Sequence, residues 1–187
     1  MKSIAALFLA ILLAIPACTT SLPKPPRVPA DGRILVRIDQ NFGQMGIEAI
    51  TSAISEWYAE ASICFDVQVV DVSEEYETWP DDGVTTIYFC GEGTWPKAVF
   101  DIFEKRSGIT NPIGFTLMST KDVFLSDEYF ALRQVAMHEI GHVLGIAQHS
   151  TNRTSTMYHI ALSGGFQRVT KEDAALAAKL NPTHRCR

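Results

Sequence analysis

Two histidines with a glutamate beside the first are the residues of this sequence best suited to chemistry. His138, Glu139 and His142 belong to the stretch HEIGHVLGIAQHS, residues 138–150. On a helix of 3.6 residues per turn, the two histidines project from one face about 6 Å apart at their roots, so they can hold one Zn²⁺ ion. Glu139 points slightly around the helix, where it can contact a zinc-bound water without binding the metal. The same pattern also arises by chance on ordinary helices.

The residues after this pair indicate a complete site. Gly145 stands where a helix must end, because glycine adopts the left-handed conformation at little cost, and His149 follows within reach. Zinc lowers the pKa of a bound water toward ~7, and Glu139 can take the proton of that water as it attacks a carbonyl. The metal then stabilises the oxyanion that forms. The chemistry predicted is therefore zinc-assisted hydrolysis.

The elements that must position these residues follow from hydrophobic periodicity. Strands are expected over residues 32–42, 62–72, 84–90, 113–119 and 122–126. Helices are expected over residues 47–61, 95–108, 126–145 and 171–180. Thr170 and Asp173 resemble a capping box at the start of the last helix. This order predicts an α/β (α+β) domain, a twisted mixed five-stranded sheet with an active-site helix and a C-terminal helix.

The stretch HEIGHVLG, followed by HSTNRTSTMY, resembles the active site of the metzincin metalloproteases, and especially of the matrixin-like branch. These proteins carry a third histidine after the glycine, then a serine, then a methionine-containing turn beneath the zinc. Here Ser150 follows His149, and Met157 and Tyr158 come eight and nine residues after His149. The order of elements also matches that of a metzincin-like catalytic domain, so the resemblance extends over roughly residues 33–181.

The spacing departs from the family at the third ligand. The family places that ligand three residues after the glycine, which here is Gln148, and His149 comes one residue later. A neutral carboxamide is a weak zinc donor, and the interval from His149 to Met157 is retained. We therefore expect a one-residue bulge in the loop that lets His149 bind zinc. The alternatives are that Gln148 faces the metal, or that the site has only two histidines or has decayed.

The resemblance implies roles for further residues. Met157 would support the site from below as a Met-turn, although without the motif it would be interpreted as a core side chain. Tyr158 would begin the wall of a substrate pocket; the family usually has proline next, and here His159 follows. The edge strand near residues 113–119 would pair with an extended substrate. Structural Ca²⁺ is left open, because no defined calcium loop accompanies the candidate oxygen donors, which are Asp81, Asp82, Asp122 and Asp127.

Length and composition indicate one exported domain. The chain has 187 residues, 47% of them apolar, and a net charge of -5 without a basic stripe, which argues against nucleic acid as a partner. The apolar run over residues 4–15 suits a signal peptide and is too short to span a bilayer comfortably. We expect a signal peptide over residues 1–17, a Pro-rich tether over 18–32 and the catalytic domain over 33–187.

Each cysteine raises a separate expectation. The run IPAC ends at Cys18 and resembles a bacterial lipobox, so Cys18 is expected to be lipidated and to anchor the protein to a membrane of the bacterial cell envelope. Ordinary secretion and an uncleaved anchor are the alternatives. Cys64 and Cys90 lie at apparent strand positions, and export permits a disulfide between them, with two buried thiols as the alternative. Cys186 has no assigned role.

Together these features predict a zinc-dependent endopeptidase with one catalytic Zn²⁺ ion. His138, His142 and His149 would bind zinc, and Glu139 would act as the general base toward a protein or peptide substrate. One alternative is a zinc hydrolase acting on cell-wall peptides, and another is a non-catalytic envelope lipoprotein that retains the fold. The only membrane contact expected is the lipid anchor, and a monomer is expected.

Overall fold

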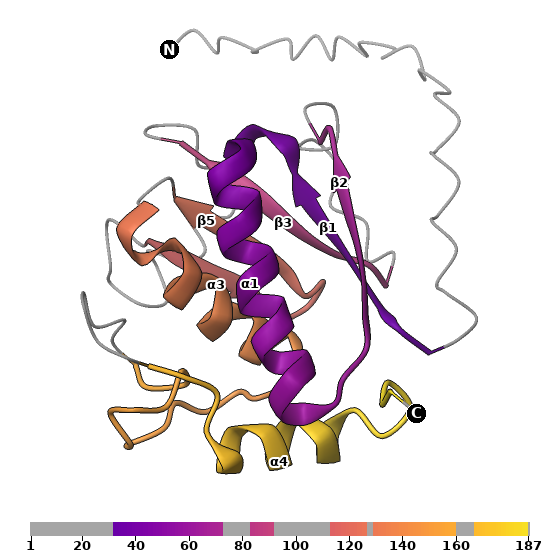
Figure 1. Cartoon of the computed structure of the whole chain (residues 1–187), viewed down its shortest axis with the longest axis vertical. Helices are drawn as coiled ribbons and strands as arrows, with labels where there is room; N and C mark the ends of the chain where they lie inside the picture. Colours follow the sequence, from indigo (N-terminus) through magenta and orange to yellow (C-terminus); the bar gives the residue numbers. More distant parts are fainter. Residues whose placement is uncertain (1–31, 73–82, 92–112, 127–128, 160–166, 187) are drawn as a thin grey trace, which may run out of the picture.

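A computed structural model describes residues 32–72, 83–91, 113–126, 129–159 and 167–186 (Figure 1). The expected signal peptide, most of the tether with Cys18, and the helix expected over residues 95–108 lie outside the described residues. None of the helices among the described residues is long and apolar enough to cross a membrane.

A five-stranded sheet in the order β2-β1-β3-β5-β4 forms the frame of the domain. The strands are β1 (Ile34–Asp39), β2 (Phe65–Val70), β3 (Thr85–Cys90), β4 (Gly114–Leu117) and β5 (Asp122–Ser126). β1 runs parallel to both β2 and β3, β3 runs parallel to β5, and β4 alone is antiparallel, paired with β5. The predicted mixed five-stranded sheet is therefore confirmed, and β4 is an edge strand as expected.

Two long helices cover one face of this sheet, and a third crosses below them (Figure 1). They are α1 (Gly43–Ala61), α3 (Tyr129–Val143) and α4 (Lys171–Leu180), and a short 3-10 helix, η1 (Gln40–Phe42), precedes α1. The predicted capping box is present, since the Thr170 side chain accepts from the Asp173 amide and the Asp173 side chain accepts from the Thr170 amide. It satisfies free amides at the start of α4 and fixes where that helix begins.

The main core lies between the sheet and the helices α1 and α3. Alternation along each strand sends Ile87 on β3, and Val123 and Leu125 on β5, toward this core. The intervening residues Tyr88 and Phe124 face the other side of the sheet, where their rings stack with centroids 5.1 Å apart. Both faces of the sheet thus carry buried side chains, and the face toward α1 and α3 joins the strands to these helices.

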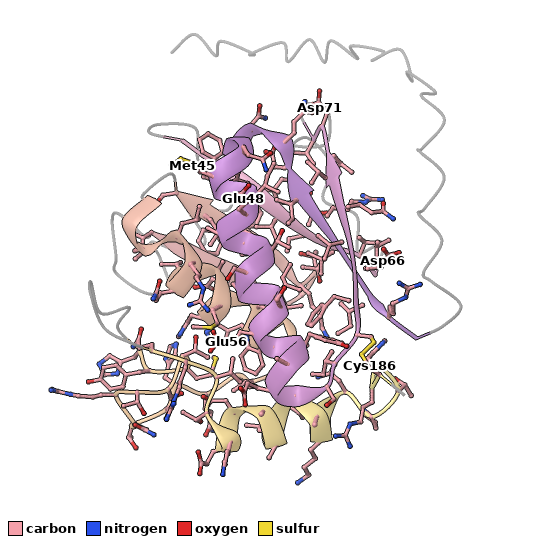
Figure 2. The ribbon with its side chains drawn as sticks, viewed as in Figure 1. Met45, Glu48, Glu56, Asp66, Asp71 and Cys186 are labelled. Atoms are coloured by element: carbon pink, nitrogen blue, oxygen red, sulfur yellow. A yellow bond between two sulfur atoms is a disulfide. The ribbon has the colours of Figure 1, made fainter. Side chains whose placement is uncertain are left out.

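Glu56 on α1 joins the helices to the segment before α4. One carboxylate oxygen forms an ion pair with Arg133 of α3, and the other accepts a hydrogen bond of 2.9 Å from the amide of Val169. Figure 2 shows Glu56 on the half of α1 nearest α4. One side chain therefore connects α1, α3 and the segment before α4.

The disulfide predicted between Cys64 and Cys90 is wrong. Cys64 pairs instead with Cys186, the two Cα atoms being 5.2 Å apart, and Cys90 is a buried free thiol (Figure 2). Cys64 precedes β2 and Cys90 ends β3, and because these strands run in the same direction the two cysteines lie at opposite ends of the sheet. The separation exceeds about 20 Å, whereas a disulfide needs Cα atoms within ~7 Å.

The C-terminal tail reaches Cys64 because it lies antiparallel to the residues before β2. Cys64 donates its amide to the carbonyl of His184, and Cys186 donates to the carbonyl of Ser62. Ile63 and Arg185 form an isolated bridge between these two contacts. The pairing therefore follows from the path of the chain after α4, which the sequence pattern did not indicate.

Candidate metal centre

The helix α3 carries three of the predicted site residues on one turn. His138, Glu139 and His142 all lie on it, and its other face is buried against α1 through residues such as Met137 and Ile140. The helical step brings the Nε2 atoms of the two histidines to 3.1 Å from each other. The indole of Trp57 on α1 donates a hydrogen bond of 2.8 Å to the carbonyl of Met137, which fixes this turn from behind.

A glycine ends α3 and turns the chain back. Gly145 has φ 90°, the left-handed region in which glycine avoids the steric clash of other residues. Its amide donates to the carbonyl of His142, and the amide of Ile146 donates to the carbonyl of Gly141, the pattern of a Schellman motif. Asn181, directly after α4, donates its side-chain amide to the carbonyl of Leu144 at 2.8 Å. The turn is thus fixed both by its own backbone and by the end of α4.

This turn brings His149 to the two helical histidines. The His149 ring centroid lies 5.1 Å from that of His138 and 5.2 Å from that of His142. One ring nitrogen from each of the three histidines can be chosen so that all lie within 4.8 Å of one another. Gln148, which occupies the family's usual ligand position, has an exposed side chain. The structure therefore brings together the three predicted metal ligands.

Backbone carbonyls fix the tautomer of the two helical histidines. Nδ1 of His138 lies 2.7 Å from the carbonyl oxygen of Thr156, and Nδ1 of His142 lies 2.7 Å from that of Ile146. A carbonyl oxygen can only accept, so each Nδ1 carries the hydrogen and each Nε2 of a neutral ring presents a lone pair.

Two lone pairs 3.1 Å apart repel each other unless a cation lies between them. Tetrahedral zinc bonds of 2.0–2.1 Å would separate two such nitrogens by about 3.3 Å, so the donor set fits zinc.

The surroundings also keep the three imidazoles neutral. Burial is the main cause that lowers the pKa of His138, to about 4, and the neighbouring histidines lower it further, while its hydrogen bond to Thr156 opposes the shift. Burial likewise lowers the pKa of His142. The more exposed His149 also has a lowered pKa, from partial burial and from the charge of His159. A metal ligand must be deprotonated to donate its lone pair, so these shifts favour metal binding at neutral pH.

Glu139 differs from the histidines in its surroundings. Burial raises the pKa of its carboxyl group to about 7, and a hydrogen bond from Thr116 opposes this shift. The Thr116 hydroxyl lies 2.7 Å from Oε2 of Glu139. A carboxylate whose pKa is near the working pH is suited to accept and return a proton.

Met157 lies directly beneath the helical part of the site. Its side chain is buried, and a Cβ atom added to Gly141 would lie 2.2 Å from its sulfur. The amide of Ser150 donates to the carbonyl of Met157 at 2.7 Å, so the two arms of the loop are joined beside His149. Tyr158 is half-buried, and its ring centroid lies 4.4 Å from that of the exposed His159.

Four residues of this region were not singled out from the sequence as part of the site: Thr116, Gly141, Ser155 and Asp173. The hydroxyl of Ser155 donates to Asp173 at 2.8 Å and accepts the amide of Met157 at 2.9 Å. Asp173 was recognised only as a cap of α4. Strand alternation could have indicated that Thr116 faces α3, but no sequence signal marks Gly141 or the partner of Ser155.

Of the four candidate calcium donors, Asp122 lies among the described residues. Asp122 is buried at the start of β5 and accepts a hydrogen bond of 3.0 Å from the amide of Thr86. The other three, Asp81, Asp82 and Asp127, lie outside the described residues. Among the residues that the structure describes, the three histidines form the group that could hold a metal ion.

The fold and this histidine cluster define a metzincin of the matrixin type, and comparison with known proteins agrees. The family model described as Matrixin matches residues 55–180, and the chain therefore belongs to the matrixin family. Among curated proteins, no sequence matches the chain significantly.

A solved structure shares the fold. This is metalloproteinase-II from Bacteroides fragilis, with a TM-score of 0.50 and 13% sequence identity. The match covers 83% of this chain and 55% of that chain, so the present chain spans about half the length of that protein. At this identity the likeness supports the fold alone.

Proposed function

We propose that the protein is a zinc-dependent endopeptidase. The observation that carries this proposal is the convergence of His138, His142 and His149, whose ligand nitrogens lie within 4.8 Å of one another beside the buried carboxyl group of Glu139. Membership of the matrixin family supports a zinc metalloprotease. Three protein ligands leave a fourth zinc position for water or substrate, as a catalytic site requires.

Each residue then has a defined task. The three histidines would hold zinc, which would supply Lewis-acid polarisation of the scissile carbonyl and of the attacking water. Glu139 accepts the proton of that water and returns it to the amine of the departing peptide, which balances the hydrolysis. Met157 packs beneath Gly141 and keeps the loop against α3. Tyr158, which forms a β-bridge with Ser150 next to the third histidine, would contribute to the substrate pocket.

The substrate would bind as an additional strand on β4. Within the part of the chain that the structure describes, β4 pairs with β5 alone and lies at the edge of the sheet. An extended peptide can pair with such an edge through main-chain hydrogen bonds, so a peptide substrate suits the site better than a compact molecule. Thr116 of this strand contacts Glu139, which places the edge beside the base.

Zinc analysis and a cleavage assay on the same preparation test the proposal. The full chain should contain about one zinc per molecule and cleave members of a random peptide library. A chelator should abolish cleavage, and added zinc should restore it. Zinc-loaded protein that cleaves no peptide would contradict the endopeptidase, and cleavage restricted to cell-wall peptides would point to the alternative substrate class.

We further propose that the protein is exported and anchored to a bacterial membrane through a lipid on Cys18. The support is the apolar run followed by IPAC in the sequence. Intact mass and detergent-phase partitioning test this proposal. A soluble exported protein with an unmodified Cys18 would contradict it.

A further inference from the structure

The hydroxyl of Thr116 contacts the side chain that is proposed to act as the base. It lies 2.7 Å from Oε2 of Glu139 and 3.1 Å from the main-chain carbonyl oxygen of the same residue. Thr116 sits in the middle of β4, and its neighbour Phe115 packs on the opposite face of the sheet, stacked on Phe124. Alternation therefore turns Thr116 toward α3.

A glycine on the same face of β4 makes this contact geometrically feasible. A Cβ atom at Gly114 would lie 2.5 Å from Cγ1 of Val135 on α3 and 2.8 Å from Cδ2 of Leu125 on β5. A larger residue at this position would force Val135 and Leu125 to shift or β4 to move away from the helix. If β4 moved, the hydroxyl two residues later would lose its reach to Glu139. The short distance is thus a consequence of how the strand and the helix pack.

The hydroxyl has a single hydrogen, so it can donate to one of its two acceptors at a time. The carboxylate is the closer acceptor and, when ionised, the stronger one. Among the described residues, no other side chain hydrogen-bonds this carboxylate. Within the described part of the chain, the donor that orients the Glu139 carboxylate therefore belongs to the edge strand.

We propose that Thr116 is a positioning residue for Glu139, holding the carboxylate toward the reacting water from the strand that receives the substrate. The inference rests on the proposed endopeptidase function. A glutamate side chain has several rotatable bonds, and a base acts only when it lies within hydrogen-bond reach of its proton. A peptide that pairs with β4 would also fix the strand that carries Thr116. Substrate binding and alignment of the base are thereby coupled through one side chain.

Substitutions that change only the hydroxyl test this role. Thr116→Val keeps the branched shape and removes the donor, and Thr116→Ser keeps the donor. Thr120→Val is the matched control, because it removes a hydroxyl from the β4–β5 turn that contacts Asp122 and not Glu139. We expect Thr116→Val to lower kcat about 10- to 100-fold with KM and zinc affinity within about twofold, and Thr116→Ser to recover most of the loss. Unchanged kcat in Thr116→Val, or a change confined to KM or zinc affinity, would overturn the inference.

A second measurement does not depend on catalysis. The carboxyl ¹³C resonance of Glu139, identified as the glutamate signal lost in Glu139→Gln, should shift in Thr116→Val. It should keep its position in Thr120→Val and return toward it in Thr116→Ser. An unshifted resonance would show that the contact is absent and would overturn the inference even with an active enzyme. If instead the wild type binds zinc and cleaves no peptide, the proposed function fails whatever the resonance does.

Discussion

The candidate metal centre has two halves that are held in place by different means. His138, Glu139 and His142 lie on one turn of α3, whose buried face packs against α1 and the sheet. His149 lies on the loop after Gly145 and is exposed. In the helical half, the backbone hydrogen bonds of α3 and core packing fix the spacing of His138, Glu139 and His142. Individual contacts then orient only their side-chain ends, as the hydroxyl of Thr116 does for Glu139. In the loop half, the position of His149 depends on a few individual hydrogen bonds.

These bonds connect the loop to both neighbouring helices. Ser155 links Asp173 of α4 to the amide of Met157, and Thr156 donates its amide to the carbonyl of Arg168. The carbonyl of Thr156 in turn accepts from His138 of α3. The loop is thus an outer support for the helical half as well as the carrier of the third ligand. Substitutions of the base on α3 are therefore expected to lower mainly the rate of peptide cleavage. Substitutions in the loop are expected to lower mainly zinc affinity and the free energy of unfolding.

The largest effect is expected from Glu139→Ala in the helical half. The variant should lose activity by about 10²- to 10⁴-fold, because the proposed general base is gone, while zinc content and the thermal unfolding midpoint stay close to those of the wild type. Peptide cleavage rates and zinc analysis on the same preparation measure both properties. Retained activity would remove Glu139 from the mechanism, and loss of zinc would mean that the helical half also depends on this carboxylate.

The second effect tests the loop half through its ligand. Loss of a residue outside the coordination sphere typically lowers metal affinity roughly 10- to 100-fold. His149→Ala should weaken zinc binding by more than this, because it removes one of three protein donors. Gln148→Ala is the matched control one residue earlier and should leave zinc affinity nearly unchanged, since its side chain is exposed. Competitive zinc titration of both variants decides the matter. The reverse result would place the ligand on Gln148, and retained affinity in both would place it elsewhere.

The third prediction concerns the pH dependence of stability in the metal-free protein. The pKa of His138 is lowered to about 4, so as the pH falls below 6.5 the unfolded chain takes up a proton that the folded chain resists, and stability falls. The pKa of Glu139 is raised to about 7, so between pH 4.5 and 7 the folded chain keeps a proton that the unfolded chain releases, and stability falls as the pH rises. The two trends oppose each other over most of this interval. His142 and His149 have the same sign as His138.

Glu139→Gln separates these trends, because glutamine does not titrate. The free energy of unfolding of the variant should increase more steeply from pH 4.5 to 7 than that of the wild type, by about 2–3 kcal/mol over the interval. Urea denaturation of chelator-treated protein at several pH values measures the difference. Parallel curves for the two proteins would mean that folding does not raise the pKa of the Glu139 carboxyl group.

The smallest effect is expected from Ser155→Ala, which removes one support of the loop half. The buried carboxylate of Asp173 would lose one of its donors, and the amide of Met157 would lose its acceptor. The expected loss of stability is about 1–2 kcal/mol, with zinc affinity lowered roughly 10-fold. Thr154→Ala is the control, because among the described residues its hydroxyl donates to Asn152 within the exposed loop. Equal effects of the two substitutions would show that the link from α4 does not support the metal site.

The elements of the fold were largely predictable because each has a local signal. The capping box of Thr170 and Asp173, the apolar stripe of α1 and the alternation along the strands all depend on residues close together in sequence. The motif from His138 to Met157 was predictable for the same reason, since helical spacing and a glycine turn are short-range properties. The pairing of Cys64 with Cys186 was not, because it depends on where the chain runs after α4.

The sequence by itself determined the chemistry available to this protein: two imidazoles and a carboxylate on one helical turn, with a third imidazole after the glycine. Only the tertiary structure decided which partners surround them. Gly141 lacks a side chain because Met157 occupies that space, and Thr116 reaches Glu139 because Gly114 lets an edge strand approach α3. Side-chain types and short spacings are written in the order of residues, whereas close approach between distant segments arises only when the whole core packs.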